Sequence, residues 1–380
     1  MKNLKKMISL IMIVALLVAS LAACGSNGSG GDTAQAVKIA IAGPQTGDFA
    51  EYGIGFRNAV EMMVEEWNAD GGVLGQQIEV VVYDDKNEGE EAATIAERIV
   101  ADSSILGVVG HFASGVCMAA SPTYQENGVV NISPSASHPD FTSEGDYIFR
   151  NNTVIDIEAR AGVEIATELY GKTKIGVLSV RTDWGASTAE ITKEIIESVG
   201  AEVVDHQEVL EGTVDFSSNI SRLHNAGAEV VIVAAMYNTL GPFATQYKEV
   251  NPDIELVGFS NAYSRQLIEL AGDNAENIHF PTQFFDGSEQ ENVATFVTNY
   301  REKYGSNPSS LTAQAYDSAG IILTAIQNAN STDRAAIRDE VAAIEYEGVT
   351  GYTVFDEFRD SVRPFTFVKI ENGEFVEVIQ

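Results

Sequence analysis

The apolar residues of this chain gather into short β-branched runs that alternate with stretches of helical periodicity. Each run reads as a buried parallel strand, because its apolar residues are continuous rather than alternating. The first expected strands lie at residues 37–42, 78–83 and 107–110. The helices expected between them lie at residues 56–67 and 90–101. This βαβαβ order predicts a parallel sheet with right-handed crossovers.

A second series of the same kind begins near Thr153. Its expected helices lie at residues 157–170, 186–199, 216–226 and 241–250. Its expected strands lie at residues 174–180, 202–207, 230–235 and 254–259. Short loops between such elements are typical of α/β proteins. Because 380 residues exceed one ordinary hydrophobic core, the two series predict two α/β lobes.

The residues after about 290 are less regular. Helices with apolar stripes are expected at residues 292–304, 312–329 and 334–344. Short strands, antiparallel by their pattern, are expected at residues 352–355, 365–370 and 375–378. These elements are too few for a third domain. We therefore expect them to complete the two lobes, with the chain crossing between the lobes more than once.

The N-terminus has the features of a lipoprotein signal. Three lysines precede an apolar stretch at residues 7–19 that is short for a membrane span. Residues 21–24, Leu-Ala-Ala-Cys, match the lipobox, in which the signal is cut before the cysteine and its thiol takes a diacylglycerol. We predict a signal peptide over residues 1–23, a flexible tether over residues 24–35, and an extracytoplasmic protein anchored to the cell membrane by a lipid on Cys24. The alternative is a plain secretory signal with an incidental cysteine.

The chain is strongly acidic, with a formal net charge of −32. Cleavage before Cys24 removes three lysines and takes the charge to −35. That field repels nucleic acid and anionic lipid headgroups, so neither is an expected partner. The negative charge does not exclude an anionic ligand, because backbone N–H dipoles act at contact range while salt screens the field of the surface. The five histidines are scattered without i, i+4 pairing, so we expect neither a metal site nor a cofactor.

The expected strand at residues 107–110 and a further β-branched run at residues 129–132, also expected to be a buried strand, end in loops of small and hydroxyl-bearing residues. The loop at residues 111–115 carries Ser114, and the loop at residues 134–137 carries Ser135 and Ser137. In an open α/β sheet such loops line the ligand crevice, and the helix that follows offers unpaired N–H groups to an anion. We therefore expect these serines to bind a small carboxylate-bearing ligand. The plainer interpretation is that they are helix caps and turn residues.

A function of a different class, a secreted serine hydrolase, has a weaker signal. Residues 258–262 approximate a nucleophile elbow around Ser260, with Asp273 and His279 following in hydrolase order. The second small position of the elbow is Ala262, the helix between these residues is short, and the sequence offers no oxyanion loop. We therefore expect that the protein is not an enzyme.

Several short motifs follow one another in an order that is specific when they are taken together. They are residues 37–40, 43–47, Tyr-Gly at 52–53, Asn-Ala-Asp-Gly-Gly-Val-Leu-Gly at 68–75, Tyr-Asp-Asp at 83–85, Gly-His at 110–111, Ile-Ser-Pro at 132–134 and Ala-Tyr-Asp at 315–317. In order and spacing the chain resembles the leucine/isoleucine/valine-binding family, the type I periplasmic solute-binding proteins of branched-chain amino acid ABC transporters. The resemblance spans about residues 36–360, which is nearly the whole mature chain.

The resemblance implies an α/β fold of two doubly wound parallel-sheet lobes joined by a three-strand hinge, with the ligand between the lobes. The N-terminal lobe would comprise residues 36–152 and 282–350. The C-terminal lobe would comprise residues 153–281 and 351–380. The three crossovers would fall near residues 151–153, 281–284 and 350–353.

The resemblance also implies ligand contacts at the positions that match. The first lobe would hold the carboxylate of an amino acid through serines and backbone groups and would cover its side chain with an aromatic ring. The implied residues on this lobe are Tyr52, Phe112, Ala113, Ser114, Ser135 and Ser137. The implied residues on the other lobe are Trp184, Met236 and its neighbour Tyr237.

One departure from the family pattern concerns the ammonium group of the ligand. Amino-acid binders of this family neutralise it with a carboxylate from the C-terminal lobe, and the matching position here is Ser260. A buried ammonium without an anionic partner costs roughly several kcal/mol. Either Asp183 or Asp317 therefore replaces that partner, or the ligand is a carboxylate or amide that carries no ammonium.

The function expected from the sequence is that of a lipid-anchored extracytoplasmic solute receptor. It would close like a hinge on one small molecule and deliver it to the membrane permease of an ABC transporter. A branched-chain or other amino acid is the family default, and another small carboxylate or amide is the alternative. The sensor domain of a signalling receptor, which shares this fold, is the rival role among binding proteins.

Overall fold

The first lobe is built on a five-stranded parallel sheet with strand order β2-β1-β3-β4-β5. The computed structural model describes residues 37–378, so the predicted signal peptide, tether and lipidated Cys24 lie outside the described residues. The strands are β1 (Val37–Gly43), β2 (Ile78–Asp84), β3 (Ile105–Gly110), β4 (Val130–Ser133) and β5 (Ile148–Arg150). The helices that connect the first four strands are α2 (Ala50–Ala69), α3 (Gly89–Ala101) and α4 (Ser114–Asn127). The predicted βαβαβ order is confirmed.

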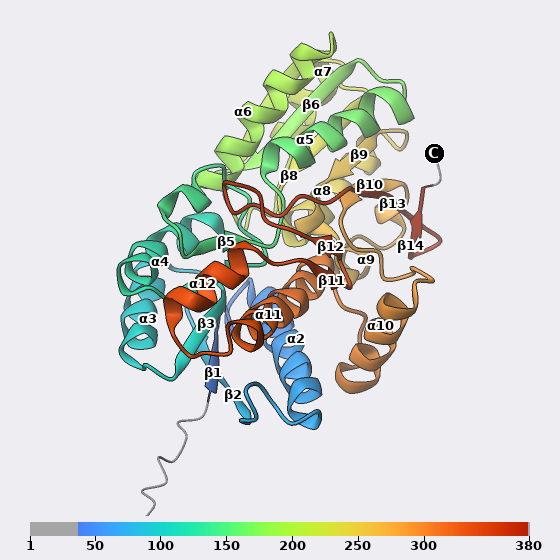
Figure 1. The fold of residues 1–380 in the computed structure, drawn as a ribbon. Coiled ribbons are helices and arrows are strands. Elements are labelled where there is room, and N and C mark those ends of the chain that lie inside the picture. The colour runs from blue at the N-terminus through green and yellow to red at the C-terminus, as the bar shows by residue number, and fades with distance from the viewer. Residues whose placement is uncertain (1–36, 379–380) are drawn as a thin grey trace, which may run out of the picture. The chain divides into compact units, whose positions relative to one another are not determined.

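The second lobe is built on a seven-stranded sheet with order β14-β13-β10-β9-β8-β6-β7, in which β13 and β14 form an antiparallel edge. Its strands are β6 (Lys174–Val180), β7 (Glu202–Val209), β8 (Val230–Ala234), β9 (Glu255–Gly258), β10 (Ile278–Thr282), β13 (Thr366–Glu371) and β14 (Glu374–Glu377). Its helices are α5 (Ile155–Glu164), α6 (Asp183–Ser198), α7 (Ser217–Asn225), α8 (Tyr237–Val250) and α9 (Arg265–Ala271). In Figure 1, β6, α6 and α7 lie in the upper part of the view and β1, β2 and β3 in the lower part.

The central strands of both sheets are buried along their whole length. Every residue of β3 and of β8 is buried, which is the pattern of parallel strands covered by helices on both faces. This burial explains why the sequence shows continuous apolar runs rather than alternation. The predicted α/β fold of two parallel-sheet lobes is therefore confirmed.

Helix α11 (Ser310–Ala329) forms the interior of the first lobe. It packs along α2, touches β3 and β4, and carries α12 (Arg334–Ala342) on another side. Helix α10 (Glu291–Tyr304) also contacts α2. A hairpin of β11 (Tyr346–Gly348) and β12 (Gly351–Thr353) follows α12 and contacts α11. None of the helices in residues 37–378 is long and apolar enough to cross a membrane.

The chain passes between the two sheets three times, from β5 to α5, from β10 to α10 and from β12 to β13. One buried side chain, Arg363, touches all three passages. Its Nη2 donates to Asn151 O (2.8 Å) and to Gln283 Oε1 (3.1 Å). Its Nη1 donates to the hydroxyl oxygens of Thr350 and Thr353, the second at 3.0 Å. We call Arg363 and these four partners the crossing cluster.

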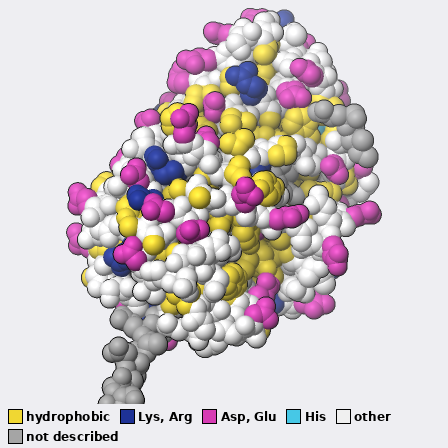
Figure 2. Space-filling model, in the orientation of Figure 1, with side chains coloured by type: hydrophobic (Ala, Val, Ile, Leu, Met, Phe, Trp, Pro, Cys, Tyr) yellow, Lys and Arg dark blue, Asp and Glu magenta, His cyan; other side chains and the backbone are white. Residues whose placement is uncertain are grey.

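The main differences from the sequence prediction lie in short elements. Strands β5 and β11 and helix α9 were not predicted, because runs of three to seven residues carry little periodicity. The longer helix α4 was not predicted either, because its small and polar residues, with Pro122 among them, form no clear apolar stripe. The predicted helix at residues 157–170 begins at Ile155 and ends in a π-helical turn, Ile165–Leu169. Acidic side chains are spread over the face shown in Figure 2, where lysines and arginines are fewer, in keeping with the net charge of −32.

Candidate ligand-binding site

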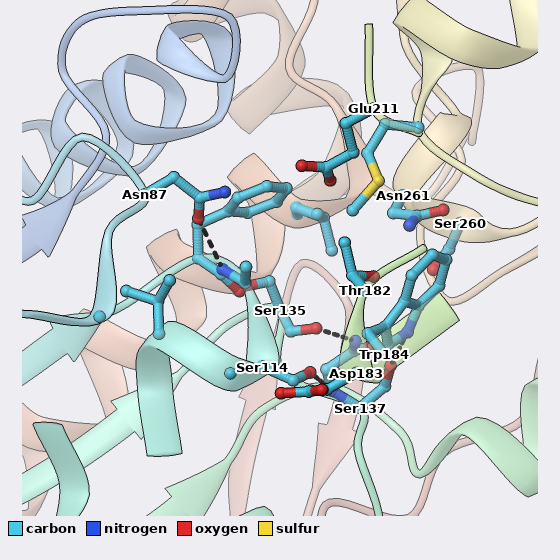
Figure 3. Close-up of a pocket in the computed structure, with 18 of the residues that line it drawn as sticks. Asn87, Ser114, Ser135, Ser137, Thr182, Asp183, Trp184, Glu211, Ser260 and Asn261 are labelled. Atoms are coloured by element: carbon cyan, nitrogen blue, oxygen red, sulfur yellow. Dashed lines mark hydrogen bonds between the residues drawn. The ribbon is translucent and has the colours of Figure 1, made fainter. Parts of the chain in front are cut away.

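A cavity of about 360 Å³ lies where the carboxyl ends of strands from both sheets face each other. Apart from Leu311 in α11, its walls come from the residues that follow β2 to β9, which is where open α/β sheets place their ligands. Most of the site residues expected from the sequence are brought together here (Figure 3). They are Phe112, Ala113, Ser114, Ser135, Ser137, Asp183, Trp184, Met236 and Ser260.

The first wall is the start of α4. Ala113 is its N-cap residue, and Ser114, Gly115 and Val116 in its first turn line the cavity. The first N–H groups of a helix have no partner within the helix, so they face the cavity as donors for an anion. Ser114 Oγ accepts hydrogen bonds from the backbone N–H groups of Ser137 (3.2 Å) and His138 (3.3 Å). The two serine loops are thereby joined into one surface.

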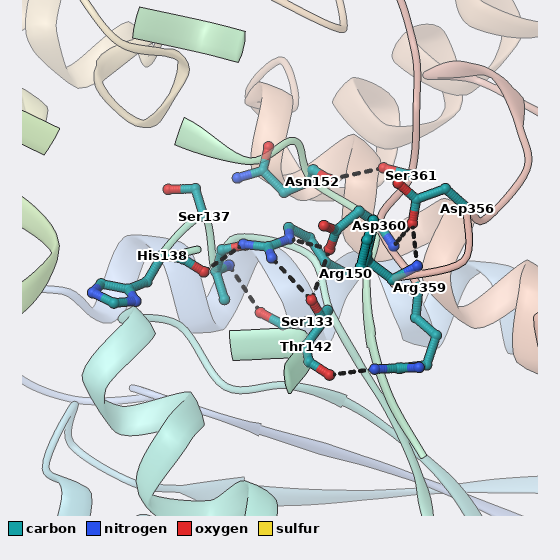
Figure 4. Close-up of polar contacts among 12 residues, drawn as sticks. Ser133, Ser137, His138, Thr142, Arg150, Asn152, Asp356, Arg359, Asp360 and Ser361 are labelled. Atoms are coloured by element: carbon teal, nitrogen blue, oxygen red, sulfur yellow. Dashed lines mark hydrogen bonds and ion pairs between the residues drawn. The ribbon is translucent and has the colours of Figure 1, made fainter. Parts of the chain in front are cut away.

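The second loop is held from behind by a buried arginine. Arg150 Nη1 donates to His138 O (2.7 Å), and its Nε pairs with Asp360 Oδ1 (2.7 Å) (Figure 4). Burial lowers the pKa of Arg150, and Asp360 opposes that shift. Ser135 Oγ in turn donates to Phe112 O (2.7 Å). Because both sides of the loop are fixed, the hydroxyl of Ser137 is presented to the cavity in a set position.

The opposite wall belongs to the second lobe, and it touches the first lobe directly. Trp184 Nε1, in the first turn of α6, donates to Ser137 Oγ (2.8 Å). At the cleft edge, Ser264 Oγ donates to Glu51 Oε1 (2.6 Å). The first bond crosses the cavity, and the second lies at a separate small pocket. Both bonds join residues of the two lobes, so the structure shows the cleft closed.

Three residues expected at the site do not line this cavity. Tyr52 stacks on Phe112 with ring centroids 4.2 Å apart and donates its hydroxyl to Asn261 O (2.7 Å), so it lies behind the wall. Tyr237 packs against Tyr52 at 5.8 Å and also lies outside the lining. The role given to Asp317 is wrong. Its buried carboxylate accepts N–H bonds from Val349 (2.9 Å) and Thr350 (2.8 Å) at a different pocket.

The structure adds a carboxylate that the sequence reasoning missed. Glu158, in α5, lines the cavity and is only 2% exposed. Its Oε1 accepts a hydrogen bond from Ser260 N (2.6 Å). Burial raises the pKa of Glu158 to about 7, and the hydrogen bonds from Ser260 oppose that shift. A sequence signal existed, since Ile155, Glu158, Ala159 and Gly162 share the helix face that is buried.

Two further acids line the cavity, Asp183 at the start of α6 and Glu211 after β7, and both are exposed at its rim. No lysine, arginine or histidine is among the lining residues. Across residues 37–378, no group of three or more His, Cys, Asp or Glu side chains is arranged to hold a metal ion. The cavity thus combines a helix N-terminus on one side with a buried carboxylate on the other.

The hydrolase alternative receives no support from the geometry. His279 Nδ1 faces the hydroxyl of Tyr170 and Asn277 O (3.1 Å) rather than Ser260. Ser260 instead caps the carboxylate of Glu158 through its backbone N–H. The serine–histidine pair that activates the nucleophile of such a hydrolase is therefore not formed at Ser260. The expectation of a binding protein rather than an enzyme agrees with this arrangement.

Comparison with known proteins identifies the family. The model of the periplasmic binding protein family matches residues 36–374. A leucine-, isoleucine-, valine-, threonine- and alanine-binding protein of Pseudomonas aeruginosa is 30% identical over 342 residues, covering 89% of this chain and 90% of that protein. The branched-chain amino acid transporter substrate-binding protein of Streptococcus pneumoniae, solved with isoleucine, superposes with a TM-score of 0.84 at 28% identity over 90% of this chain and all of that one.

A solute-binding protein of Rhodopseudomonas palustris, solved with 3,4-dihydroxybenzoic acid, has the same fold, with a TM-score of 0.84 at 21% identity over 90% of this chain and 96% of that one. The fold therefore serves ligands with and without an ammonium group. The family match covers every strand of both sheets except the end of β14. The chain belongs to the Leu/Ile/Val-binding family of type I periplasmic binding proteins, a family of binding proteins and not of enzymes.

Proposed function

We propose that this protein is the extracytoplasmic solute-binding component of an ABC importer and that it captures a single small amino acid. The proposal rests on the cavity, which has hydrogen-bond donors on one wall and a buried carboxylate on the opposite wall. Helix α4 and Ser137 offer donors to a carboxylate, and the opposite wall offers Glu158 to an ammonium. A volume of about 360 Å³ lies near the lower end of the usual range for ligand pockets, which suits one small molecule. The relatives named for branched-chain amino acids support this ligand class.

Capture works by closure of the two lobes on the ligand. The bond from Trp184 to Ser137 and the bond from Ser264 to Glu51 exist only when the lobes meet. A ligand that touches both walls binds the closed state more tightly than the open one, and it shifts the population by that difference. We place the hinge at the three passages joined by the crossing cluster, between lobes of residues 36–152 with 282–350 and residues 153–281 with 351–380.

We also propose that the mature protein is held at the outer surface of the cell membrane by a lipid on Cys24 and hands its ligand to the importer's permease. The lipobox at residues 21–24 supports the anchor. Partition of the full chain into the detergent phase of a cloud-point separation tests it. The Cys24→Ser variant should stay in the aqueous phase, and equal partition of both forms would contradict the anchor.

A carboxylate without an ammonium is the second candidate ligand. Ser260 stands at the acidic position of the family pattern, and the rings of Phe112 and Trp184 line the cavity, so an aromatic acid also fits its chemistry. Thermal unfolding of residues 25–380 with each protein amino acid and with benzoate separates the two candidates. A ligand at 100 times its dissociation constant stabilises the closed form by about 2.7 kcal/mol. Stabilisation by an amino acid supports the proposal, whereas stabilisation by benzoate alone contradicts the amino-acid part of it.

A further inference from the structure

Glu158 occupies an unusual environment for an acidic side chain. It projects from α5, which packs against α6 and β10, and only 2% of it is exposed. Its hydrogen-bond partner is Ser260, whose backbone N–H donates to Oε1 at 2.6 Å and whose hydroxyl also lies within hydrogen-bonding reach. An ionised carboxylate has about four acceptor sites, so acceptor capacity remains on the side that faces the cavity.

No cation in the described part of the chain pairs with this carboxylate. Among residues 37–378, none of the ion pairs includes Glu158, and no basic side chain lines the cavity. Burial without a counter-charge raises the pKa of Glu158 to about 7. A buried acid kept at such a cost is typical of sites that wait for a charged partner.

The other acids are less suited to that role. Asp183 and Glu211 are exposed, so water screens their charges. The carboxylate of Asp317 is occupied by the N–H groups of Val349 and Thr350. Glu158 is the lining acid that is both buried and adjacent to Ser260.

We propose that Glu158 binds the cationic nitrogen of the ligand, and that it does so in place of an acid at position 260. The backbone N–H of Ser260 fixes Glu158 Oε1, which orients the carboxylate toward the cavity. The charge of the acid thus reaches the cavity from α5 rather than from the loop after β9. This inference rests on the proposed function, because it requires a ligand that carries an ammonium group.

The test compares Glu158→Gln with wild type by titration calorimetry. The probes are used in pairs. One probe is a protein amino acid that stabilises the wild type, and the other is the carboxylate that lacks only the ammonium group of that amino acid; L-leucine and 4-methylpentanoate are one such pair. Glutamine keeps the shape and can accept the Ser260 N–H bond, so only the charge is lost. We expect the amino acid to bind about a hundredfold more weakly, as for a buried charge that loses its partner, and its deamino analogue to change less than about threefold.

Glu164→Gln is the matched control, because it makes the same change on the same helix outside the cavity, and it should leave both affinities unchanged. If Glu158→Gln does not fold, Glu158→Asp replaces it, with an expected loss of about tenfold for the amino acid alone. Transfer of the acid, by adding Ser260→Asp to Glu158→Gln, should restore part of the affinity.

The outcomes separate the two proposals. Amino-acid binding that Glu158→Gln leaves intact would overturn the role of Glu158 and leave the proposed function standing. Wild-type binding of ammonium-free carboxylates alone would overturn the role of Glu158 and the amino-acid ligand but leave the receptor. A wild-type protein that binds neither probe series would overturn the proposed function and this inference with it.

Discussion

Arg363 holds the crossing cluster together, so its replacement should destabilise the protein. Its guanidinium is buried, with 5% of the residue exposed, and burial lowers its pKa to about 10 while Asp317 opposes that shift. Lysine keeps the positive charge but lacks the planar fork that reaches four partners in different directions. We therefore expect Arg363→Lys to lose the bonds to Asn151 O and Gln283 Oε1, or the pair to the threonine hydroxyls.

The magnitude follows from the number of bonds lost. A hydrogen bond to a charged group contributes about 1.5–3 kcal/mol, so two of them amount to roughly 3–6 kcal/mol of the free energy of unfolding. At about 2 °C per kcal/mol, the expected fall in Tm is roughly 6–12 °C. Scanning calorimetry of the ligand-free protein measures it.

The matched control is Arg222→Lys, which makes the same change at an arginine whose side chain is 66% exposed and paired with Asp205. Exposed ion pairs contribute about 0–1 kcal/mol, so its Tm should move by less than about 2 °C. If Arg363→Lys melts within 2 °C of the wild type, the crossing cluster does not hold the three passages together, and the reasoning fails.

Three further predictions follow from single contacts. Ser264→Ala removes the bond to Glu51 that forms on closure, so calorimetric titration should show about fivefold weaker ligand binding, about 1 kcal/mol. The same hydroxyl caps α9 by accepting the N–H of Gln266, so the ligand-free Tm should also fall, by about 2 °C. An unaltered affinity would argue against the bond to Glu51 as part of closure. The buried thiol of Cys117, whose pKa burial raises to about 12, should resist iodoacetamide in native residues 25–380 and react fully in guanidinium, and rapid native labelling would contradict its burial. Because the pKa of Glu158 is raised from 4.5 to about 7, its contribution to stability is present below pH 4.5 and is lost as pH rises through 7. Other buried acids such as Glu51 and Asp317 also have raised pKa values, so denaturant titrations of the ligand-free proteins should find a decline that is up to about 3 kcal/mol larger in the wild type than in Glu158→Gln. Equal declines would contradict the raised pKa of Glu158.

The fold was predictable because its signals are local. The β-branched runs that become β3 and β8 are buried on both faces, and burial of that kind leaves a continuous apolar run in the sequence. Ser114 and Ser137 were also predictable, since the end of a parallel strand places its loop at the crevice whatever the details of packing.

The acids of the site could not be assigned in the same way. Asp317 and Asp183 were the acids named from the sequence, yet Asp317 is bonded to Val349 and Thr350, more than thirty positions away along the chain. To assign Glu158 to the site, one must know which face of α5 points toward the cavity. The contact of α5 with β10 and the hydrogen bond from Ser260 N to Glu158 determine that face. The helical pattern shows that Glu158 lies on the buried face of α5, but it does not show what that face packs against, so only the folded chain reveals which carboxylate faces the cavity.

The bond between Trp184 and Ser137 should make the intrinsic tryptophan fluorescence of the protein sensitive to opening of the cleft. The chain has two tryptophans, and Trp184 has 7% of its surface exposed while its indole N–H is bonded across the cleft. Opening of the lobes would break the bond to Ser137 and expose the indole to water, while its edge-on contact with Phe259, in the same lobe, would remain. Its emission should then shift to longer wavelength. With Trp67 replaced by phenylalanine, a single intrinsic fluorophore would report the opening and closing of the cleft in real time, without any attached dye.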